Sequence, residues 1–139
     1  MILENVKNQN WFTQPIVDLG STHTDDRGNI ATIISSFKPA LGSVVIIDSK
    51  KGSIRANHYH KTDWHYCYIL SGSIDYYTRE VGSSDKPTKI TIKQHQLFYT
   101  PSLLEHAMYF PEDTVFLTLG GGSRTQEEYE ADLVRVKLI

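Results

Sequence analysis

The sequence predicts a small all-β protein, and three observations support that fold class. From residue 28 onward the apolar residues recur with period two more often than with period 3.6, which favours strands over helices. The apolar pieces are short and rich in β-branched and aromatic residues, and turn residues separate them. Nine such pieces at a spacing of roughly ten residues are typical of a β-sandwich or β-barrel. We expect strands at residues 30–37, 43–48, 53–60, 64–70, 73–80, 89–93, 96–100, 105–110 and 115–119.

The end of the chain has a different pattern. The run from Thr125 to Glu128 has the form of a capping box, which predicts a short helical turn through Ala131. Residues 133–139 then alternate again between apolar and polar positions, as a terminal strand does. An apolar terminal strand needs a partner, because an unpaired edge is an aggregation hazard. We therefore expect a homodimer in which residues 30–37 or 133–139 pair across the interface.

Length and composition indicate one ordinary globular domain spanning residues 1–139. Hydrophobic residues make up 40% of the chain and charged residues 22%, as in a folded protein with a single core. The formal net charge of -2 provides no positive field for a phosphate backbone, so nucleic acid is not an expected partner. No apolar run approaches the roughly 20 residues of a membrane helix, and no membrane partner is expected. The single cysteine, Cys67, excludes an internal disulfide, and residues 1–12 lack a signal-peptide pattern, so we expect a cytoplasmic protein.

Three of the six histidines lie within eight positions. His58 and His60 are two residues apart on a predicted strand, so both rings point to the same face, about 7 Å apart at the backbone. Residues 61–63 are polar enough to form a turn, and the next strand then brings His65 back beside the first two. This spacing is suitable for chelation of a metal ion.

A fourth histidine, His106, begins another predicted strand, and Met108 shares its face. Four converging neutral imidazoles suit a divalent first-row transition metal such as Zn, Fe, Ni, Cu or Mn better than Ca or Mg, which prefer oxygen ligands. The predicted metal ligands are therefore His58, His60, His65 and His106. The alternative is a barrel in which these histidines are acid/base groups and no metal is bound.

The spacing around these histidines resembles the first motif of the cupin superfamily. That motif is Gly, five residues, His-x-His, three or four residues, Glu, six residues, Gly, and it matches Gly52 through Gly72, with His65 in place of the glutamate. The second motif, Pro-x-Gly-x-x-His, matches Pro101 to His106, with Leu103 in place of the glycine. The resemblance implies a cupin-type jelly-roll β-barrel, to which the chain adds its short C-terminal helical turn.

A second resemblance concerns the substrate. Asp26-Arg-Gly-Asn-Ile30 and Arg55-Ala-Asn-His-Tyr-His-Lys61 are similar to segments of cupins that act on nucleotide-linked sugars, the dTDP-4-keto-sugar 3,5-epimerases and 3,4-ketoisomerases. In the second segment only the family's glycine, after the arginine, is missing. The resemblance implies a sugar-nucleotide substrate and proton-transfer roles for His58 and His60. The ketoisomerases have no histidine at the position of His65 and bind no metal, so this chain departs from them there.

A bound metal would change the chemistry of these histidines. It would occupy the lone pairs that a proton shuttle needs, and it would instead polarise a sugar carbonyl as a Lewis acid. A tyrosine or a bound water would then move the proton. Arg55 is the candidate phosphate contact, because a guanidinium matches phosphate in a bidentate geometry, and Met108 is the second candidate substrate contact. Simple alternation places Arg55 on the face opposite His58 unless a β-bulge intervenes.

Three functional hypotheses follow from the sequence. The first is a metal-binding cupin that isomerises or epimerises a nucleotide-activated sugar or similar carbohydrate, and it is the one that we favour. The second is a metal-dependent dioxygenase or other small-molecule cupin enzyme that uses open positions on iron. The third is a non-catalytic cupin that binds sugars or regulates another protein. The segment from Asp26 to Gly28 and Arg55 favour the first, and the histidine set favours the second.

Overall fold

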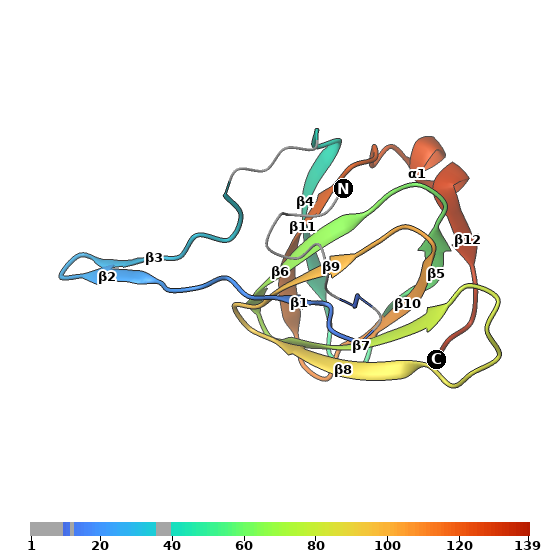
Figure 1. Cartoon of the computed structure of the whole chain (residues 1–139), viewed down its shortest axis with the longest axis horizontal. Helices are drawn as coiled ribbons and strands as arrows, with labels where there is room; N and C mark the ends of the chain where they lie inside the picture. Colours follow the sequence, from blue (N-terminus) through green and yellow to red (C-terminus); the bar gives the residue numbers. More distant parts are fainter. Residues whose placement is uncertain (1–9, 12, 36–39) are drawn as a thin grey trace.

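Two five-stranded antiparallel sheets carry most of the chain and face each other around a core (Figure 1). The structure is a computed structural model that describes residues 10–11, 13–35 and 40–139. The first sheet has the order β1 (Ile16–Val17), β9 (Leu97–Thr100), β6 (His65–Ser71), β11 (Thr114–Gly120) and β4 (Ser43–Ser49). The second has the order β12 (Leu133–Arg135), β5 (Ile54–His60), β10 (Leu104–Tyr109), β7 (Ser73–Glu80) and β8 (Thr88–Lys93).

The predicted all-β class is confirmed, with one short helix, α1 (Gln126–Asp132). The expected closed barrel is not found, because among the described residues no strand pairing joins the two sheets at their edges. The arrangement is that of a jelly roll made of two facing sheets. None of the described residues belongs to a helix long and apolar enough to cross a membrane.

Two clusters of buried side chains explain the burial of the central strands. Inward-facing residues of both sheets form the first cluster, as the alternation along β7 requires: Ile74 and Tyr76 are buried and their neighbours are not. A second cluster covers the outer face of β6, so this strand is buried on both faces. The first cluster consists of Cys67, Ile69, Ile74, Tyr76, Ile92, Phe98, Met108, Phe110 and Phe116, and the second of Trp11, Val17, Tyr66, Tyr68, Leu97 and Tyr99.

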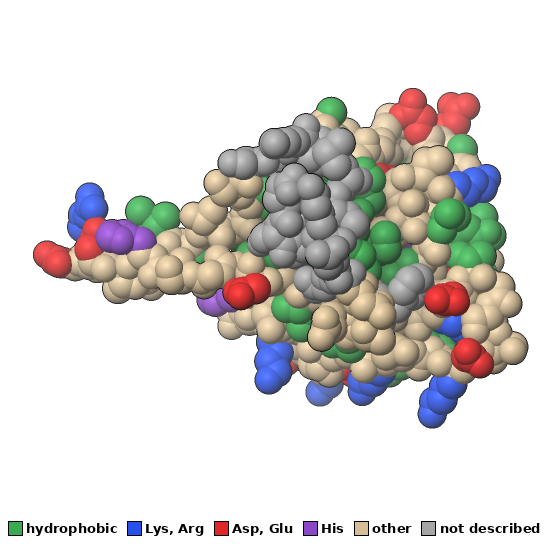
Figure 2. Space-filling view, viewed as in Figure 1, with side chains coloured by type: hydrophobic (Ala, Val, Ile, Leu, Met, Phe, Trp, Pro, Cys, Tyr) green, Lys and Arg blue, Asp and Glu red, His purple; other side chains and the backbone are tan. Residues whose placement is uncertain are grey.

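The strand predicted at residues 30–37 is wrong. Only Ile30 is in a strand, as the last residue of β3 (Gly28–Ile30), and residues 31–35 form no strand. Residues 36 and 37 lie outside the described part of the chain. β3 pairs with β2 (His23–Asp25) in a hairpin that projects from the body of the protein (Figure 1), and charged and histidine side chains gather at its end (Figure 2). The other eight predicted strands are found within one residue at each end.

The C-terminal segment pairs with its own sheet. β12 pairs with β5 and places Leu133 opposite His60. The chain then continues along Asn57, whose side-chain oxygen accepts the N–H groups of Leu138 and Ile139. The predicted helical turn is found, and it extends one residue further, to Asp132. The capping-box bonds to backbone N–H groups are not formed; the Thr125 hydroxyl instead donates to the Glu128 carboxylate at 3.0 Å.

Candidate functional site

A β-bulge in β5 shapes the site. Ala56 and Asn57 have positive φ angles of 66° and 54°, and the pairing of β5 with β10 shifts by one residue at this point. The extra residue removes the simple alternation, so Arg55 and His58 line the same cavity despite their odd spacing. The sequence analysis required a β-bulge for Arg55 to share a face with His58, and the structure contains this bulge. It brings Arg55 to the histidine side of the sheet.

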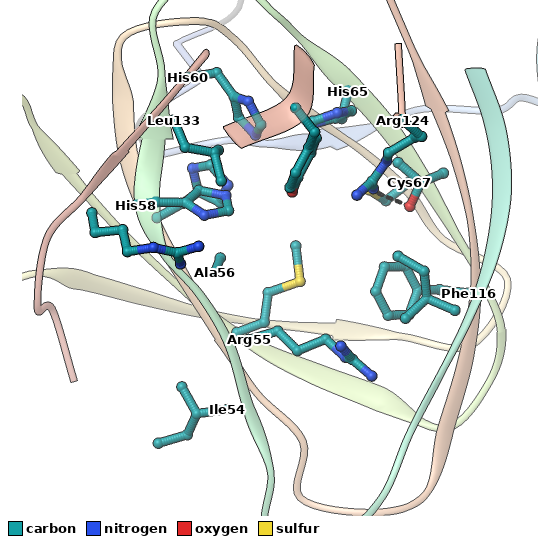
Figure 3. A pocket seen from close by; sticks show the side chains of 16 residues that line it. Ile54, Arg55, Ala56, His58, His60, His65, Cys67, Phe116, Arg124 and Leu133 are labelled. Atoms are coloured by element: carbon teal, nitrogen blue, oxygen red, sulfur yellow. Dashed lines mark hydrogen bonds between the residues drawn. The ribbon is translucent and has the colours of Figure 1, made fainter. Parts of the chain in front are cut away.

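Three of the four predicted metal ligands converge. His58 and His60 come from β5 and His106 from β10, and the three residues are at least 94% buried. One ring nitrogen from each lies within 4.8 Å of the others. The ring centroids of His58 and His60 are 4.8 Å apart (Figure 3), and those of His58 and His106 are also 4.8 Å apart. One nitrogen atom from each of the three rings is therefore close enough to the others to share one ion.

Hydrogen bonds fix the orientation of two of these rings. Nδ1 of His106 lies 2.9 Å from the carbonyl oxygen of Leu104, and Nδ1 of His60 lies 3.3 Å from Oδ2 of Asp132. Because both acceptors take a proton from Nδ1, the Nε2 atoms keep their lone pairs. Nε2 of His60 has no hydrogen-bond partner among the described residues and is shut off from solvent. A histidine held through Nδ1 with a free Nε2 is the usual form of a metal ligand.

His65 lies beside this group and faces a different partner. Its ring centroid is 4.6 Å from that of His60, but its Nε2 lies 3.1 Å from Oδ2 of Asp63. The three-histidine group within 4.8 Å does not include it. Asp63 also accepts the N–H groups of Trp64 and Gly122 through Oδ1. Burial raises the pKa of Asp63, but the bonds from His65 and the two N–H groups outweigh burial and lower the pKa to about 2.

Burial keeps the three grouped histidines neutral. It lowers the pKa of His58 to about 2, with a further contribution from the neighbouring His106 and His60. Burial also lowers the pKa of His106 to about 3 and that of His60 to about 4. At neutral pH all three imidazoles therefore carry a free lone pair, which both a metal ligand and a general base require.

The histidines line a cavity of about 390 Å³ between the sheets. Met108 lines it as the sequence predicts, beside the apolar Ile47 and Phe116. Arg55 also lines it, with Nε donating to the Ser49 hydroxyl at 2.7 Å and Nη2 to a backbone carbonyl of β4 at 2.9 Å. Three residues outside the two histidine motifs complete the wall: Arg124, Tyr129 and Arg135.

The sequence missed the carboxylates that support the histidines. Asp63 and Asp132 match no motif, and Asp132 is separated from its partner His60 by 72 positions. Tyr129 lies on the helical turn that the capping box predicted, and its ring centroid is 5.7 Å from that of His60. The sequence marks the segment from Arg124 to Arg135 only weakly, and its pattern gives no indication of where the helix packs.

Comparison with known proteins identifies the fold. No protein-family model and no curated protein matches the chain. Among solved structures, the capsular polysaccharide assembling protein CapF of Staphylococcus aureus is 20% identical with a TM-score of 0.62, over 88% of this chain and 34% of CapF. The QdtA sugar 3,4-ketoisomerase of Thermoanaerobacterium thermosaccharolyticum, in complex with TDP, is 20% identical with a TM-score of 0.66, over 83% of this chain and 82% of QdtA.

A third structure adds an epimerase to these. The dTDP-6-deoxy-D-glucose-3,5-epimerase RmlC of Legionella pneumophila, in complex with dTDP-4-keto-L-rhamnose, is 16% identical with a TM-score of 0.63, over 78% of this chain and 66% of RmlC. This chain spans about a third of the length of CapF (34%). The chain thus has the cupin fold that its two histidine motifs predict.

Proposed function

We propose that this chain isomerises or epimerises a nucleotide-linked keto sugar by moving a proton at a carbon atom next to the ketone. The observation that carries the proposal is the pairing of the buried His60, which lines the cavity, with the half-buried Asp132 behind it. The cavity is of the size that small-molecule sites have. The likeness of the fold to a ketoisomerase and an epimerase supports the same reaction class.

Asp132 defines what His60 does in the absence of a metal. With the proton on Nδ1 facing Oδ2 of Asp132, Nε2 is the basic nitrogen of the ring. When Nε2 takes a proton from the sugar, the carboxylate stabilises the imidazolium that forms. His58, whose ring centroid is 4.8 Å from that of His60, is the second candidate proton carrier.

The three-histidine group also fits a divalent transition metal. The nitrogen atoms are buried, neutral at pH 7 and within 4.8 Å of one another, and the free Nε2 of His60 lacks a partner. We propose that His58, His60 and His106 would hold Zn, Fe, Ni, Cu or Mn, with His65 as the predicted fourth ligand at its edge. Such a metal, when bound, supplies Lewis acidity at a sugar carbonyl.

Tyr129 is the residue that we assign to proton transfer when His60 serves as a ligand. Its ring centroid lies 5.7 Å from that of His60 and 6.4 Å from that of His58. Burial raises the pKa of the Tyr129 hydroxyl, and the nearby Arg124 lowers it by a smaller amount. The hydroxyl is therefore protonated at neutral pH, which suits the donor of a proton to the sugar.

Arg55 and Arg135 are the proposed contacts of the nucleotide diphosphate. Both line the cavity, and both have exposed side chains, which is consistent with a position at the entrance of the cavity. Their guanidinium groups match phosphate oxygens in a bidentate geometry. We expect Arg55→Ala to raise the Kd for dTDP at least tenfold and to leave the metal content unchanged, as isothermal titration and elemental analysis will measure.

Proton exchange in D₂O tests the proposed reaction directly. Protein as purified is incubated with a nucleotide-linked 4-keto-6-deoxy sugar, and proton NMR follows the signals of the carbons next to the ketone. We expect deuterium to replace one of these protons, and we expect Tyr129→Phe and His60→Asn to slow the replacement at least 100-fold. Tyr109→Phe, a variant of a tyrosine outside the cavity wall, is the matched control and should keep the parent rate.

Two results together would contradict the proposal. They are the absence of deuterium incorporation and the absence of any rise in melting temperature with nucleotides or nucleotide sugars. Oxygen consumption by the Fe(II)-loaded protein would then favour the dioxygenase hypothesis, since three histidines leave open positions on iron.

We also propose that the protein is a homodimer. β4 is an edge strand, and two apolar side chains on one of its faces, Val44 and Ile46, are 55% and 65% exposed. Light scattering should give twice the 15.8 kDa chain mass at micromolar concentration. Ile46→Glu should shift the mass toward one chain, because a buried unpaired carboxylate disfavours association. A parent mass of one chain would contradict the proposal.

A further inference from the structure

The wall of the histidine cavity carries an excess of positive charge. Three arginines and four histidines line it, and no Asp or Glu is among the described residues that do so. Arg135 is paired with Glu130 at 2.8 Å, and Arg55 donates only to neutral oxygen atoms of β4. Arg124 forms no ion pair with a carboxylate in the described part of the chain. Because a guanidinium stays protonated at every working pH, this wall selects an anionic ligand.

Arg124 differs from the other two arginines in its surroundings. Arg55 and Arg135 have exposed side chains, whereas Nε of Arg124 is shut off from solvent and has no hydrogen-bond partner among the described residues. Figure 3 shows its guanidinium pointing into the cavity near Cys67, on the side opposite His58. The site therefore has one half-buried cation, with its Nε shut off from solvent, that the diphosphate contacts at the entrance do not use.

The segment before Arg124 holds it in this place. A Cβ atom on Gly121 would lie 2.5 Å from Nε1 of Trp64, so only glycine allows this close approach. The N–H of Gly122 donates to Oδ1 of Asp63 at 2.7 Å, which ties the segment to the turn before β6. The guanidinium carbon of Arg124 then lies 4.4 Å from the ring centroid of Tyr129. The cation is packed against an aromatic face and is not a loose surface side chain.

A carboxylate on the sugar satisfies this arrangement. A buried donor without an acceptor is unfavourable, and a planar carboxylate accepts from Nε and Nη of one guanidinium together. Tyr129 contacts Arg124 and lies beside the histidines, so a sugar bound at the histidines lies next to the guanidinium as well. We propose that Arg124 binds a carboxylate carried by the sugar itself, so the substrate class is a nucleotide-linked acidic sugar. This inference rests on the proposed function and specifies its substrate.

Paired ligands that differ in one group test the inference. UDP-glucuronate and UDP-glucose share the nucleotide and the sugar ring, and only the first carries a carboxylate at C6. Isothermal titration of the parent protein should give at least tenfold tighter binding of UDP-glucuronate. Arg124→Gln should reduce this preference to less than about twofold and leave the affinity for UDP-glucose within about twofold of the parent value. Arg124→Lys keeps the charge and should keep part of the preference.

Controls separate the possible outcomes. Lys86→Gln removes one positive charge from an exposed loop and should keep the full preference, and unchanged melting temperatures will show that the variants are folded. Equal binding of the two sugars by the parent would overturn the inference and leave the proposed function intact. An equal loss of both affinities in Arg124→Gln would also overturn it, since Arg124 would then act on a group that the two ligands share. Failure of UDP, dTDP and both sugars to bind would instead overturn the proposed function.

Discussion

Asp132 and His60 are 72 positions apart in the sequence, and Oδ2 of Asp132 lies 3.3 Å from Nδ1 of His60. The same carboxylate accepts the N–H and the hydroxyl of Thr62 through Oδ1 and the N–H of Asp63 through Oδ2. One side chain from the end of α1 therefore orients the ring of His60 and fixes the turn that leads into β6. The C-terminal segment is in this way part of the site and not only an edge strand of the second sheet.

We expect Asp132→Asn to weaken metal binding 10- to 100-fold. Both oxygens of the Asp132 carboxylate accept hydrogen bonds, one from Thr62 and the other from His60, whereas an asparagine amide has only one oxygen that can accept. The ring of His60 therefore loses its fixed orientation, and its Nε2 becomes less basic. A titration of Zn(II) against a competing chelator will measure the affinity. Asp75→Asn, which changes a carboxylate on the outer side of β7 that accepts from Thr91, is the control. Equal zinc affinities for Asp132→Asn and the parent would show that Asp132 does not support a metal site.

The grouping of the histidines predicts unequal effects of removing them. His106→Asn removes one of three nitrogens that lie within 4.8 Å of one another and should leave less than about a tenth of an equivalent of bound metal. His65→Asn removes a ring that faces Asp63 and should keep most of the metal. Elemental analysis after reconstitution near pH 7 will measure both. Equal losses in the two variants would support the four-ligand set that the sequence predicts and contradict the three-ligand grouping.

The lowered pKa values predict that the metal-free protein loses stability in mild acid. In the unfolded chain a histidine has a pKa near 6.5, whereas in the folded protein the pKa values are about 2 for His58, 4 for His60 and 3 for His106. Below pH 6.5 the unfolded state therefore binds more protons, and the free energy of unfolding falls as the pH falls. Each histidine contributes about 1.4 kcal/mol per pH unit, so the slope near pH 5 reaches about 4 kcal/mol per pH unit.

Urea unfolding of chelator-treated protein between pH 7 and pH 5 will measure this slope. His106→Asn should reduce it by about a third, because one buried neutral imidazole is removed. His95→Asn is the matched control, since His95 is exposed and its positive φ of 66° suits asparagine, and it should leave the slope unchanged. A stability that does not change between pH 7 and pH 5 would show that the three histidines are not buried in the neutral form.

The sequence predicted the strands well and the supporting residues of the site poorly, for a physical reason. Period-two alternation is a local pattern, and it located every strand from β4 to β11. It failed at residues 30–37. Ile33 and Ile34 lie in a loop and pack against the second cluster of buried side chains without forming a strand. The helix α1 was visible from its first turn, but no local pattern shows which side chains it points toward β5.

The two motifs predicted the convergence of His58, His60 and His106. The turn after β5 brings His65 beside His60, but its ring faces Asp63 and is not part of the three-histidine group. The motifs could not predict that Asp132 and Arg124 lie at the site, because both depend on how the segment after β11 packs against β5 and the turn before β6. The bulge at Ala56 was also outside the pattern. Its φ of 66° is a conformation that the glycine at this position of the resembling family adopts without strain.

Leu103 is a second non-glycine residue with a positive φ at a position where the family motif has glycine. It replaces the glycine of the second cupin motif, and its φ of 59° shows that the backbone keeps the left-handed conformation. The N–H of Leu103 donates to the carbonyl oxygen of His60 at 2.8 Å, so the turn that carries it is tied to the site strand. A left-handed conformation costs a residue with a Cβ atom about 1–2 kcal/mol, whereas glycine adopts it freely.

We therefore expect Leu103→Gly to stabilise the protein. Relief of the left-handed strain exceeds the additional entropy of glycine in the unfolded chain, which is about 0.4–1 kcal/mol, so the net gain is about 0.5–1 kcal/mol. Little packing is lost, because Leu103 is 56% exposed. Leu41→Gly is the matched control: Leu41 is 44% exposed and is not among the described residues with positive φ, so only the entropic loss applies and stability should fall. Midpoints of urea unfolding at pH 7 will compare the two, and a Leu103→Gly variant less stable than the parent would mean that the contacts of the leucine side chain outweigh the strain of its backbone.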